Sequence, residues 1–473
     1  MDVSTAAEIA AIPALELPAL YRGRQLSPVD VTQAVLDRAE EVQQDLNCFY
    51  EIDHKGASRS AKESEKRWLA DEEIGLLDGV PATVKENIAV AGFRRPSGSA
   101  ACADAPRESS DGPAAARLRE AGAPIIGLTV MPDLGMLSSG VSSLHGVTRS
   151  PWNPEWTVGG SSGGAGAAAT AGVGPFHLGS DIAGSVRLPA TWLGLFSLKP
   201  TFGRVPVDPP YMGRVVGPLT RTVADAALLL SEVSRPDVRD CSSLTVDPVD
   251  WHSLVKPVPE DMVRGSKVAF HLDAGAGIPT DPEVAALVGR AVAHFEAAGA
   301  DVTEIAPPMT PDYLDGLDMF LRTRSLADIV ALDEDRQAKL LPFVREWARG
   351  AERTSGVETM RNLQTIWSLR RDTIIRTSPY DLVLSPVSAV AAFPAEWPMP
   401  TNSPETALHH VAYAVPYNLS EQPAASINCG FTADGRPVGL QIAGRRFDDA
   451  QVLKAAHWYE QTRPESAVPA WPL

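Results

Sequence analysis

The segment 267–305 constrains the fold more than any other part of this 473-residue chain. Lys267–Leu272 has the pattern of a strand, and Asp281-Pro282 is typical of a helix start. Gly299 ends that helix, Val302–Ile305 begins another strand, and one helical face carries Val284, Leu287, Ala291 and Phe295. A strand, a helix and a strand in this order predict parallel strands with helices packed on them. We therefore expect an α/β fold.

The remaining pattern predicts one large domain. Residues 1–70 are expected to be mainly helical, with a first clear helix start at Ser27-Pro28, and residues 307–375 are expected to be amphipathic helices. Ala424–Asn428 and Val438–Ile442 have the pattern of a strand pair joined by a turn. The chain has no internal repeat and no low-complexity linker, so separable domains are not expected.

Charge and cysteine usage exclude several classes of function. With 42 basic and 59 acidic residues, the formal charge is −17, which disfavours nucleic acid and anionic membranes as partners. The first twenty residues lack the positive region of a signal peptide, and no run of about 18 apolar residues occurs. We expect a cytoplasmic protein without a metal site or disulfides, because four cysteines lie far apart: Cys48, Cys102, Cys241 and Cys429.

The densest local signal is the loop Gly159–Gly164, in which four glycines surround Ser161 and Ser162. Such a backbone can turn sharply and approach another group closely. A flexible linker is one alternative, but helix-forming alanines follow at once. A phosphate loop would need a lysine where Ala165 stands. The loop also matches G-x-S-x-G, but the preceding prolines make a poor strand, so the nucleophile-elbow context fails.

Two further features complete the candidate site. Gly179–Ala190 places Ser185 after small residues, whose backbone N–H groups can converge on one point as in an oxyanion hole. A glycine-containing turn is the alternative for this segment alone. Lys85 ends an apolar stretch, and burial there favours the neutral amine, which can act as a general base.

Together, Lys85, Ser161 and Ser185 resemble the amidase signature family. The resemblance covers most of the chain, and the motifs that carry it are Gly79–Ile88, Ala116–Thr129, Asn153, Gly159–Gly164, Gly179–Ala190, Lys199–Arg204, Gly217–Thr222, Asn418–Pro423 and Gly435–Phe447. It implies an α/β amidase signature fold with a large mixed, mostly parallel central sheet covered by helices on both faces. It also implies a mainly helical N-terminal region 1–70, a catalytic core 71–235, a variable substrate-pocket region 236–375 and a C-terminal region 376–473 that returns to the core sheet.

The resemblance further implies a Ser–cis-Ser–Lys triad. Ser185 would attack the carbonyl carbon, Ser161 on a cis peptide bond would bridge, and Lys85 would be the general base. The expected oxyanion hole consists of the backbone N–H groups of Ile182, Ala183, Gly184 and Ser185. The residues expected to support the two loops are Ser162, Asp181 and Arg187.

The chain departs from the family pattern at several positions. Ala183 replaces the first of two glycines before the nucleophile, Glu86 is longer than the usual acid, and Ser180 replaces a threonine. Glutamine-using members, the glutamyl-tRNA amidotransferase A subunits, carry an aspartate near the C-terminus that holds the amino group of glutamine. Residues 407–415 contain no acid here, which argues against glutamine dependence.

These features predict a hydrolase that cleaves the C–N bond of a small carboxamide, or of a related hydrazide, anilide or ester. We expect Met136, Leu137 and Ser138 beside the reacting serine, and an apolar or aryl acyl group rather than a charged one. An amidotransferase subunit that supplies ammonia to a partner and a non-catalytic binding module are the alternatives. The resemblance implies no cofactor, and many relatives are homodimers, so a homodimer is expected.

Overall fold

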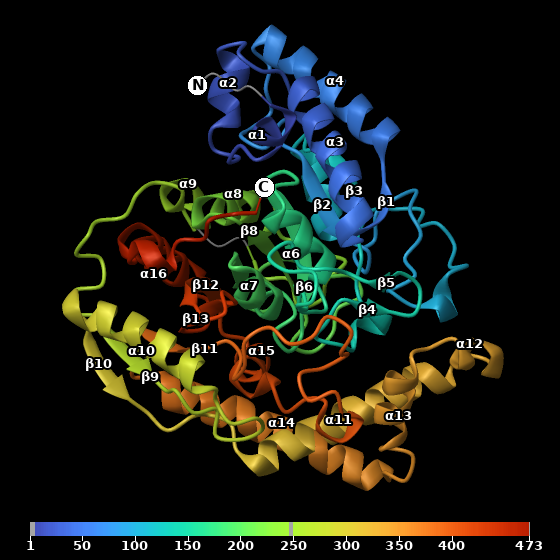
Figure 1. The fold of residues 1–473 in the computed structure, drawn as a ribbon, viewed down its shortest axis with the longest axis vertical. Helices are drawn as coiled ribbons and strands as arrows, with labels where there is room; N and C mark the ends of the chain where they lie inside the picture. The colour runs from blue at the N-terminus through green and yellow to red at the C-terminus, as the bar shows by residue number, and fades with distance from the viewer. Residues whose placement is uncertain (1–4, 246–248, 473) are drawn as a thin grey trace.

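The computed structural model describes residues 5–245 and 249–472. One sheet of 11 strands runs through the middle of the molecule (Figure 1). In spatial order its strands are β1 (Phe49–Ile52), β3 (Ile125–Thr129), β2 (Ala82–Lys85), β6 (Phe176–Asp181), β8 (Val215–Thr220), β7 (Phe196–Lys199), β12 (Ala424–Phe431), β13 (Pro437–Gly444), β11 (Leu382–Pro386), β9 (Lys267–Phe270) and β10 (Asp301–Glu304). A separate two-stranded ribbon consists of β4 (Val141–Ser142) and β5 (Gly146–Val147).

Strand directions divide the sheet into three groups. The neighbours β3, β2 and β6 are parallel at one side, and β11, β9 and β10 are parallel at the other. The strands between these groups pair antiparallel, as does β1 at its edge. The predicted large mixed sheet is confirmed, but parallel pairing is confined to the flanks, so the centre is more antiparallel than the sequence indicated.

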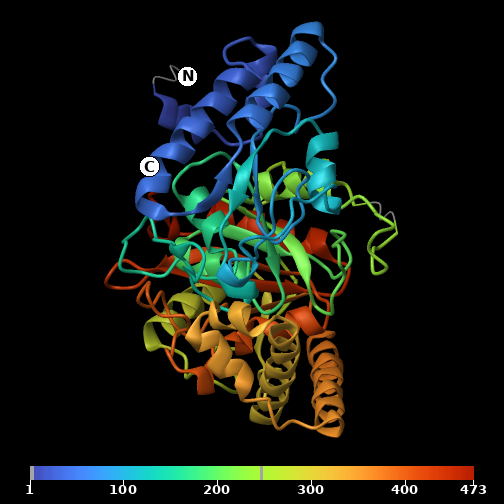
Figure 2. The same ribbon diagram turned by 90° about the vertical axis from the view of Figure 1, so that its right-hand side faces the viewer.

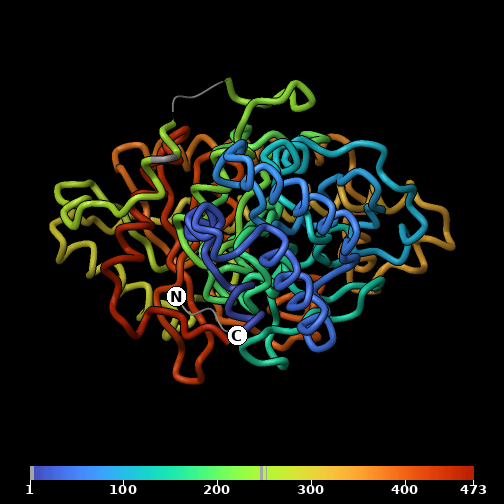
Figure 3. Tube along the Cα trace, turned by 90° about the horizontal axis from the view of Figure 1, so that it is seen from above, coloured from blue at the N-terminus to red at the C-terminus, as the bar shows by residue number. Residues whose placement is uncertain are grey.

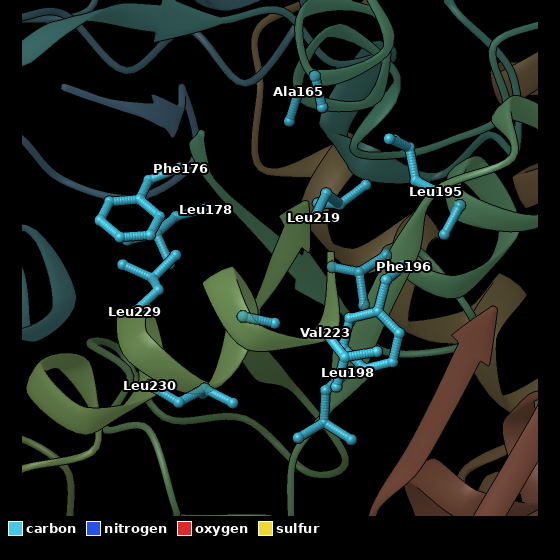
Figure 4. Packing of buried hydrophobic residues seen from close by; sticks show 14 of the residues in the cluster. Ala165, Phe176, Leu178, Leu195, Phe196, Leu198, Leu219, Val223, Leu229 and Leu230 are labelled. Carbon is cyan, nitrogen blue, oxygen red and sulfur yellow. The ribbon is translucent and has the colours of Figure 1, made fainter. Parts of the chain in front are cut away.

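Helices cover both faces of the sheet. On one face, α6 (Gly163–Thr170) and α7 (Arg187–Leu193) pack against each other and on β6 and β7, respectively. On the other face lie α8 (Val223–Val233) and α16 (Asp449–Thr462), joined by α5 (Pro113–Glu120), α9 (Trp251–Leu254) and α10 (Pro282–Ala297). Figure 4 shows the apolar core, in which Leu219 of β8 lies in the same buried cluster as Ala165 of α6 and Leu229 of α8.

Two further groups of helices lie at opposite ends of the molecule (Figures 1 and 2). The blue N-terminal group is α1 (Ala6–Ala10), α2 (Leu17–Arg22), α3 (Pro28–Leu46) and α4 (His54–Ala70). The yellow and orange group is α11 (Pro311–Val330), α12 (Glu334–Ala338), α13 (Pro342–Arg349) and α14 (Gly356–Thr377), with α15 (Val415–Leu419) packed on α14. Seen from above, the N-terminal group lies over the middle of the molecule (Figure 3). Residues 5–70 and 307–375 are thus mainly helical, as predicted, while residues 1–4 lie outside the described part of the chain.

Local sequence signals account for several of these elements. Ser27 caps α3 in a reciprocal capping box with Asp30, and Pro28 occupies the first helical turn. The predicted strand–helix–strand unit is observed as β9, α10 and β10, with the two strands adjacent and parallel. In the described ranges, no helix is long and apolar enough to cross a membrane.

Candidate active site

Two parallel neighbouring strands bring the predicted site residues together. Lys85 is the last residue of β2, and Asp181 is the last residue of β6, which pairs with β2 in parallel. The carboxyl ends of adjacent parallel strands meet at one edge of a sheet, where open α/β proteins commonly bind ligands. The segment that leads from β6 to Ser185 therefore starts beside Lys85.

The Lys85 amino group is buried among three serine hydroxyls. Its Nζ lies 2.7 Å from the Oγ of Ser161, 3.0 Å from that of Ser162 and 3.2 Å from that of Ser180. The side chain of Lys85 is completely buried. Burial, followed by the positive charge of Arg214, lowers the pKa of Lys85 well below its usual value of 10.5. This environment favours an amine that can accept a proton.

The glycine-rich loop can pass through its crowded surroundings only because it lacks side chains at two positions. A Cβ at Gly160 would lie 2.6 Å from backbone atoms of Leu137 and Ser139, and a Cβ at Gly164 would lie 2.5 Å from the carbonyl oxygen of Cys48. The peptide bond between Gly160 and Ser161 is cis. This tight approach places Ser161 at the end of the Lys85 side chain.

Ser162 and Ser180 connect the glycine-rich loop Gly159–Gly164 with the segment Gly179–Ala190. The Ser162 Oγ donates to the Ser180 carbonyl at 3.2 Å and accepts from the Ser180 N–H at 3.2 Å. The Nδ2 of Asn87 donates to the Ser180 Oγ at 3.0 Å. The sequence marked Ser180 only as a departure from the family, and Asn87 was missed, although it lies two residues after Lys85.

Asp181 and Arg187 form a buried ion pair that holds the segment around Ser185. The Asp181 carboxylate accepts from the N–H of Gly184 at 2.7 Å and of Val186 at 3.2 Å, and from the Arg187 Nε at 3.1 Å. Burial alone would raise the pKa of Asp181, but Arg187 and these donors hold it well below its usual range. The Arg187 guanidinium also donates to the Asn418 Oδ1 at 2.5 Å. Because the Gly184 N–H already has a partner, three of the four predicted oxyanion donors remain.

Breaking the Asp181–Arg187 pair is expected to destabilise the protein. Arg187→Met should lower the free energy of unfolding by about 3–5 kcal/mol, because it leaves a buried carboxylate without its cation. Denaturant titration at neutral pH checks this value. Since the folded pKa of Asp181 is lowered, this contribution is present above about pH 4 and is lost as the pH falls through the folded pKa.

A matched variant separates this local effect from a general one. Arg204→Met breaks a second buried pair, in which the Arg204 Nε lies 3.2 Å from the Asp449 Oδ2. We expect Arg204→Met to lower the free energy of unfolding as well. For the same loss of stability, Arg187→Met should lower kcat more than Arg204→Met does, because of these two arginines only Arg187 holds the Ser185 segment. Wild-type stability of Arg187→Met would contradict the assignment.

Ser161 and Ser185 open into one pocket of about 460 Å³. Its lining residues are Asn87, Arg95, Ser97, Cys102, Met131, Leu134, Gly135, Ser161, Ser180, Ile182, Ser185, Pro209, Pro210, Tyr211, Arg214, Arg324, Asp328 and Leu332. No histidine is among these described lining residues. A neighbouring apolar cavity shares Ile182 and Tyr211 but measures about 10 Å³, which is room for one water molecule at most. Of these two spaces, only the pocket that Ser161 and Ser185 line has room for an organic molecule.

The loop after β3 contributes to this pocket through residues that differ from those expected. Met131, Leu134 and Gly135 line it, whereas Met136, Leu137 and Ser138 are not among its lining residues. Leu137 and Ser138 are buried, and the Ser138 Oγ lies 2.7 Å from the Nε2 of His410. A tight turn at Leu134 and Gly135, both with positive φ, redirects the chain, which residue spacing alone does not reveal.

Glu86 holds the loop after β3 that lines the pocket. Its buried carboxylate accepts from the Met131 N–H at 2.9 Å, and its Oε1 lies 3.1 Å from the Nε2 of His145. Glu86, which is longer than the acid usual in the family, thus binds the backbone N–H of the pocket residue Met131. In the residues that the structure describes, no cluster of histidine, cysteine, aspartate and glutamate side chains could hold a metal ion.

Of the two side-chain contacts that the predicted triad requires, the structure contains one, between Lys85 and Ser161. The contact between Lys85 and Ser161 is present, and Ser161 and Ser185 line the same pocket. Between the Oγ atoms of these two described serines, no hydrogen bond is formed in the structure. The pocket nevertheless contains the Ser185 hydroxyl, with the Lys85 amine of lowered pKa and several backbone N–H groups nearby. Nucleophilic catalysis requires groups of these three kinds.

The chain is similar to known proteins over nearly its whole length. Residues 30–453 match the family model described as Amidase. An acylamidase of Rhodococcus erythropolis is 34% identical over 96% of both chains. The glutamyl-tRNA(Gln) amidotransferase A subunit of Moorella thermoacetica is 32% identical over 98% of this chain and 100% of that protein. The crystal structure of a bacterial aryl acylamidase of the amidase signature family superposes with a TM-score of 0.87 at 26% identity, covering 98% of each chain.

Proposed function

The chain belongs to the amidase signature family of amide-hydrolysing enzymes, and from this premise we propose that it hydrolyses small carboxamides through an acyl-enzyme on Ser185. The observation that carries the proposal is the 2.7 Å contact between Lys85 and Ser161 inside a pocket that Ser185 also lines. The likeness to an acylamidase and an aryl acylamidase supports amides over other acyl compounds.

Acylation starts with the attack of the Ser185 Oγ on the amide carbonyl carbon. The Ser185 proton passes to the Ser161 Oγ while the Ser161 proton passes to the neutral amine of Lys85. The N–H groups of Ile182, Ala183 and Ser185 stabilise the oxyanion, while Gly184 keeps its bond to Asp181. When the C–N bond breaks, the same two residues return the proton to the leaving amine.

Deacylation reverses this proton path. A water molecule attacks the acyl ester and gives its proton, through Ser161, to Lys85. The carboxylic acid then leaves, and the Ser185 Oγ regains a proton from the same relay. The net reaction consumes one water and releases one acid and one amine, without a cofactor in any step.

Labelling with a fluorophosphonate tests the nucleophile directly. We expect peptide mass spectrometry to find the adduct on Ser185, and we expect excess substrate to slow the labelling. An adduct on Ser161 would contradict the assigned roles and revive the nucleophile-elbow hypothesis. If no serine is labelled and no amide is hydrolysed, the binding-module hypothesis would be preferred.

An amidotransferase component is the second candidate, because glutamyl-tRNA(Gln) amidotransferase A subunits are about 30% identical over nearly the whole chain. Against it, residues 407–415 contain no acid. The one acidic residue of the described pocket lining, Asp328, lies 3.5 Å from the Nε of Arg324. We therefore expect ammonia release from a simple carboxamide but not from glutamine, with or without a partner protein. The reverse result would favour the amidotransferase.

The pH dependence of kcat/KM is expected to report the proton of Lys85. Because the base acts in its neutral form, kcat/KM for an uncharged amide should rise with pH through an acid limb. Burial and the charge of Arg214 lower the pKa of Lys85. Arg214→Gln should therefore move this limb to higher pH, since removing a neighbouring cation raises that pKa. An unmoved limb would show that another group titrates.

The remaining sequence-based expectations stay predictions. These are the cytoplasmic location, the homodimer, the extension of the activity to hydrazides, anilides or esters, and the division of the chain at residues 70, 235 and 375. Substrate contacts by Met136, Leu137 and Ser138 are replaced in our proposal by Met131, Leu134 and Gly135, which line the pocket.

A further inference from the structure

The pocket around Ser185 is rich in positive charge. Its lining includes Arg95, Arg214 and Arg324 but, among the residues that the structure describes, only one acidic residue, Asp328. The whole chain, in contrast, carries a formal charge of −17. A buried charge without a partner is energetically unfavourable, so each of these arginines is expected to have a partner of opposite charge, either in the protein or in a ligand.

Two of the three arginines have partners within the protein. The Arg95 Nε lies 2.8 Å from the Glu108 Oε1. Arg324 lies 3.5 Å from Asp328, and its guanidinium stands over the Tyr211 ring at 4.5 Å. The positive charges of Arg95 and Arg324 are thus each paired with a carboxylate of the protein.

Arg214 has no such neutralising partner. One of its nitrogens donates to the carbonyl oxygen of Asn87 at 3.3 Å, and none of the described carboxylates lies within ion-pair distance of it. Burial, together with the charges of Arg95 and Arg324, lowers the pKa of Arg214 to about 10, an effect that the more distant charge of Asp208 opposes, so the group stays charged at neutral pH. Asn87 lies two residues from Lys85, so this unpaired cation is close to the reacting groups.

We propose that the substrate is an amide that carries a carboxylate, and that Arg214 binds this carboxylate. A guanidinium presents paired N–H donors that match the two oxygens of a carboxylate. One unpaired cation balances one negative charge, which fits a carboxylate better than a phosphate monoester with a charge near −2. This inference rests on the proposed function, and it replaces the uncharged acyl group that the sequence indicated.

The same charges disfavour a zwitterionic amide. An ammonium group in the pocket would need an acid, but Asp328 is paired with Arg324. Half-amides of dicarboxylic acids, or amides of an aminobenzoate, carry a carboxylate without an ammonium. These two compound types place the charge on the acyl side and on the amine side of the scissile bond, respectively.

Matched substrate pairs test the inference. Succinanilate and butyranilide differ by a charge on the acyl side, and 4-acetamidobenzoate and 4-methylacetanilide differ by a charge on the amine side. The measured quantity is the ratio of kcat/KM for the charged and the neutral member of each pair. Effects of Arg214 on the pKa of Lys85 act on both members and largely cancel in this ratio.

We expect a ratio above about 10 in one pair for the wild-type enzyme. Arg214→Gln should lower that ratio by roughly 10- to 100-fold, as for the loss of a hydrogen-bonded charge. Arg214→Lys should restore part of it, because the charge is kept but the paired donors are lost. Arg95→Gln and Arg324→Gln are the matched controls, and each should change the ratio less, because these arginines already have acidic partners.

A binding measurement separates this inference from the proposed function. Titration calorimetry of Ser185→Ala with succinanilate and with 4-acetamidobenzoate should show binding that Arg214→Gln in the same background weakens at least tenfold. Ratios near one that Arg214→Gln does not change would overturn the inference and leave the amidase intact. A different result would overturn the proposed function: the wild type hydrolyses none of these amides, although Arg214→Gln still weakens calorimetric binding of the carboxylates. Arg214 would then remain an anion-binding residue.

Discussion

Replacing Ser185 by alanine is expected to lower kcat/KM for a carboxamide by roughly 10⁴- to 10⁶-fold, as for the loss of a catalytic nucleophile. Without the Oγ no acyl ester can form, and water would have to attack the amide directly. The expected residual rate comes from binding and from the oxyanion donors. Steady-state kinetics, together with the absence of fluorophosphonate labelling at this position, measure the effect.

A matched serine provides the control. Ser197 lies buried on β7, and its Oγ has no hydrogen-bond partner among the described atoms. Ser197→Ala removes a hydroxyl from the same sheet but not from the pocket, so we expect turnover within about twofold of the wild type. A Ser185→Ala variant that is correctly folded and retains more than a few per cent of the activity would exclude the acyl-enzyme.

Replacing Lys85 by methionine is expected to lower kcat/KM by roughly 10²- to 10⁴-fold, which is the usual contribution of a positioned general base. Methionine keeps most of the buried stem and removes the amine that lies 2.7 Å from the Ser161 Oγ. The acid limb of the pH profile should disappear together with the activity. The kinetics are best measured from pH 6 to 10, because the pKa of Lys85 is lowered from 10.5.

Two further variants distinguish a base from a mere positive charge. Lys85→Arg keeps the charge but stays protonated, so it should not restore turnover. Lys199→Met removes another fully buried lysine, at the end of β7, whose Nζ donates to the Pro200 carbonyl at 2.7 Å. Its stability should fall while turnover changes little. Full activity of Lys85→Arg would contradict the proton-transfer role.

Much of the candidate site could be predicted because its signals are local. Gly160 and Gly164 occur where backbone atoms of other segments leave no room for a Cβ, so the clustering of glycines in the sequence indicated close packing. The apolar stretch before Lys85 indicated burial, and the structure places that lysine fully inside. The small residues before Ser185 indicated converging N–H groups, but not that the Gly184 N–H already donates to Asp181.

The substrate pocket could not be predicted in the same way. Arg95, Arg214 and Arg324 come from three segments separated by more than 100 residues each, and no spacing rule connects them. Their sequence neighbourhoods gave no reason to distinguish them from the other arginines of the chain. Whether each is paired also depends on distant partners, so the unpaired state of Arg214 became visible only in three dimensions.

The sequence by itself marked Lys85, Ser161 and Ser185 as candidates, while their catalytic roles came only from the family resemblance. It also determined the helix starts and the strand–helix–strand unit at residues 267–305. These depend on capping, periodicity and steric demands that act within a few residues. Only the tertiary structure decided the antiparallel centre of the sheet, the turn that removes Met136–Ser138 from the pocket lining, and the charge of the pocket. Those features depend on which distant segments meet, and that choice is made by the packing of the whole core rather than by any local pattern.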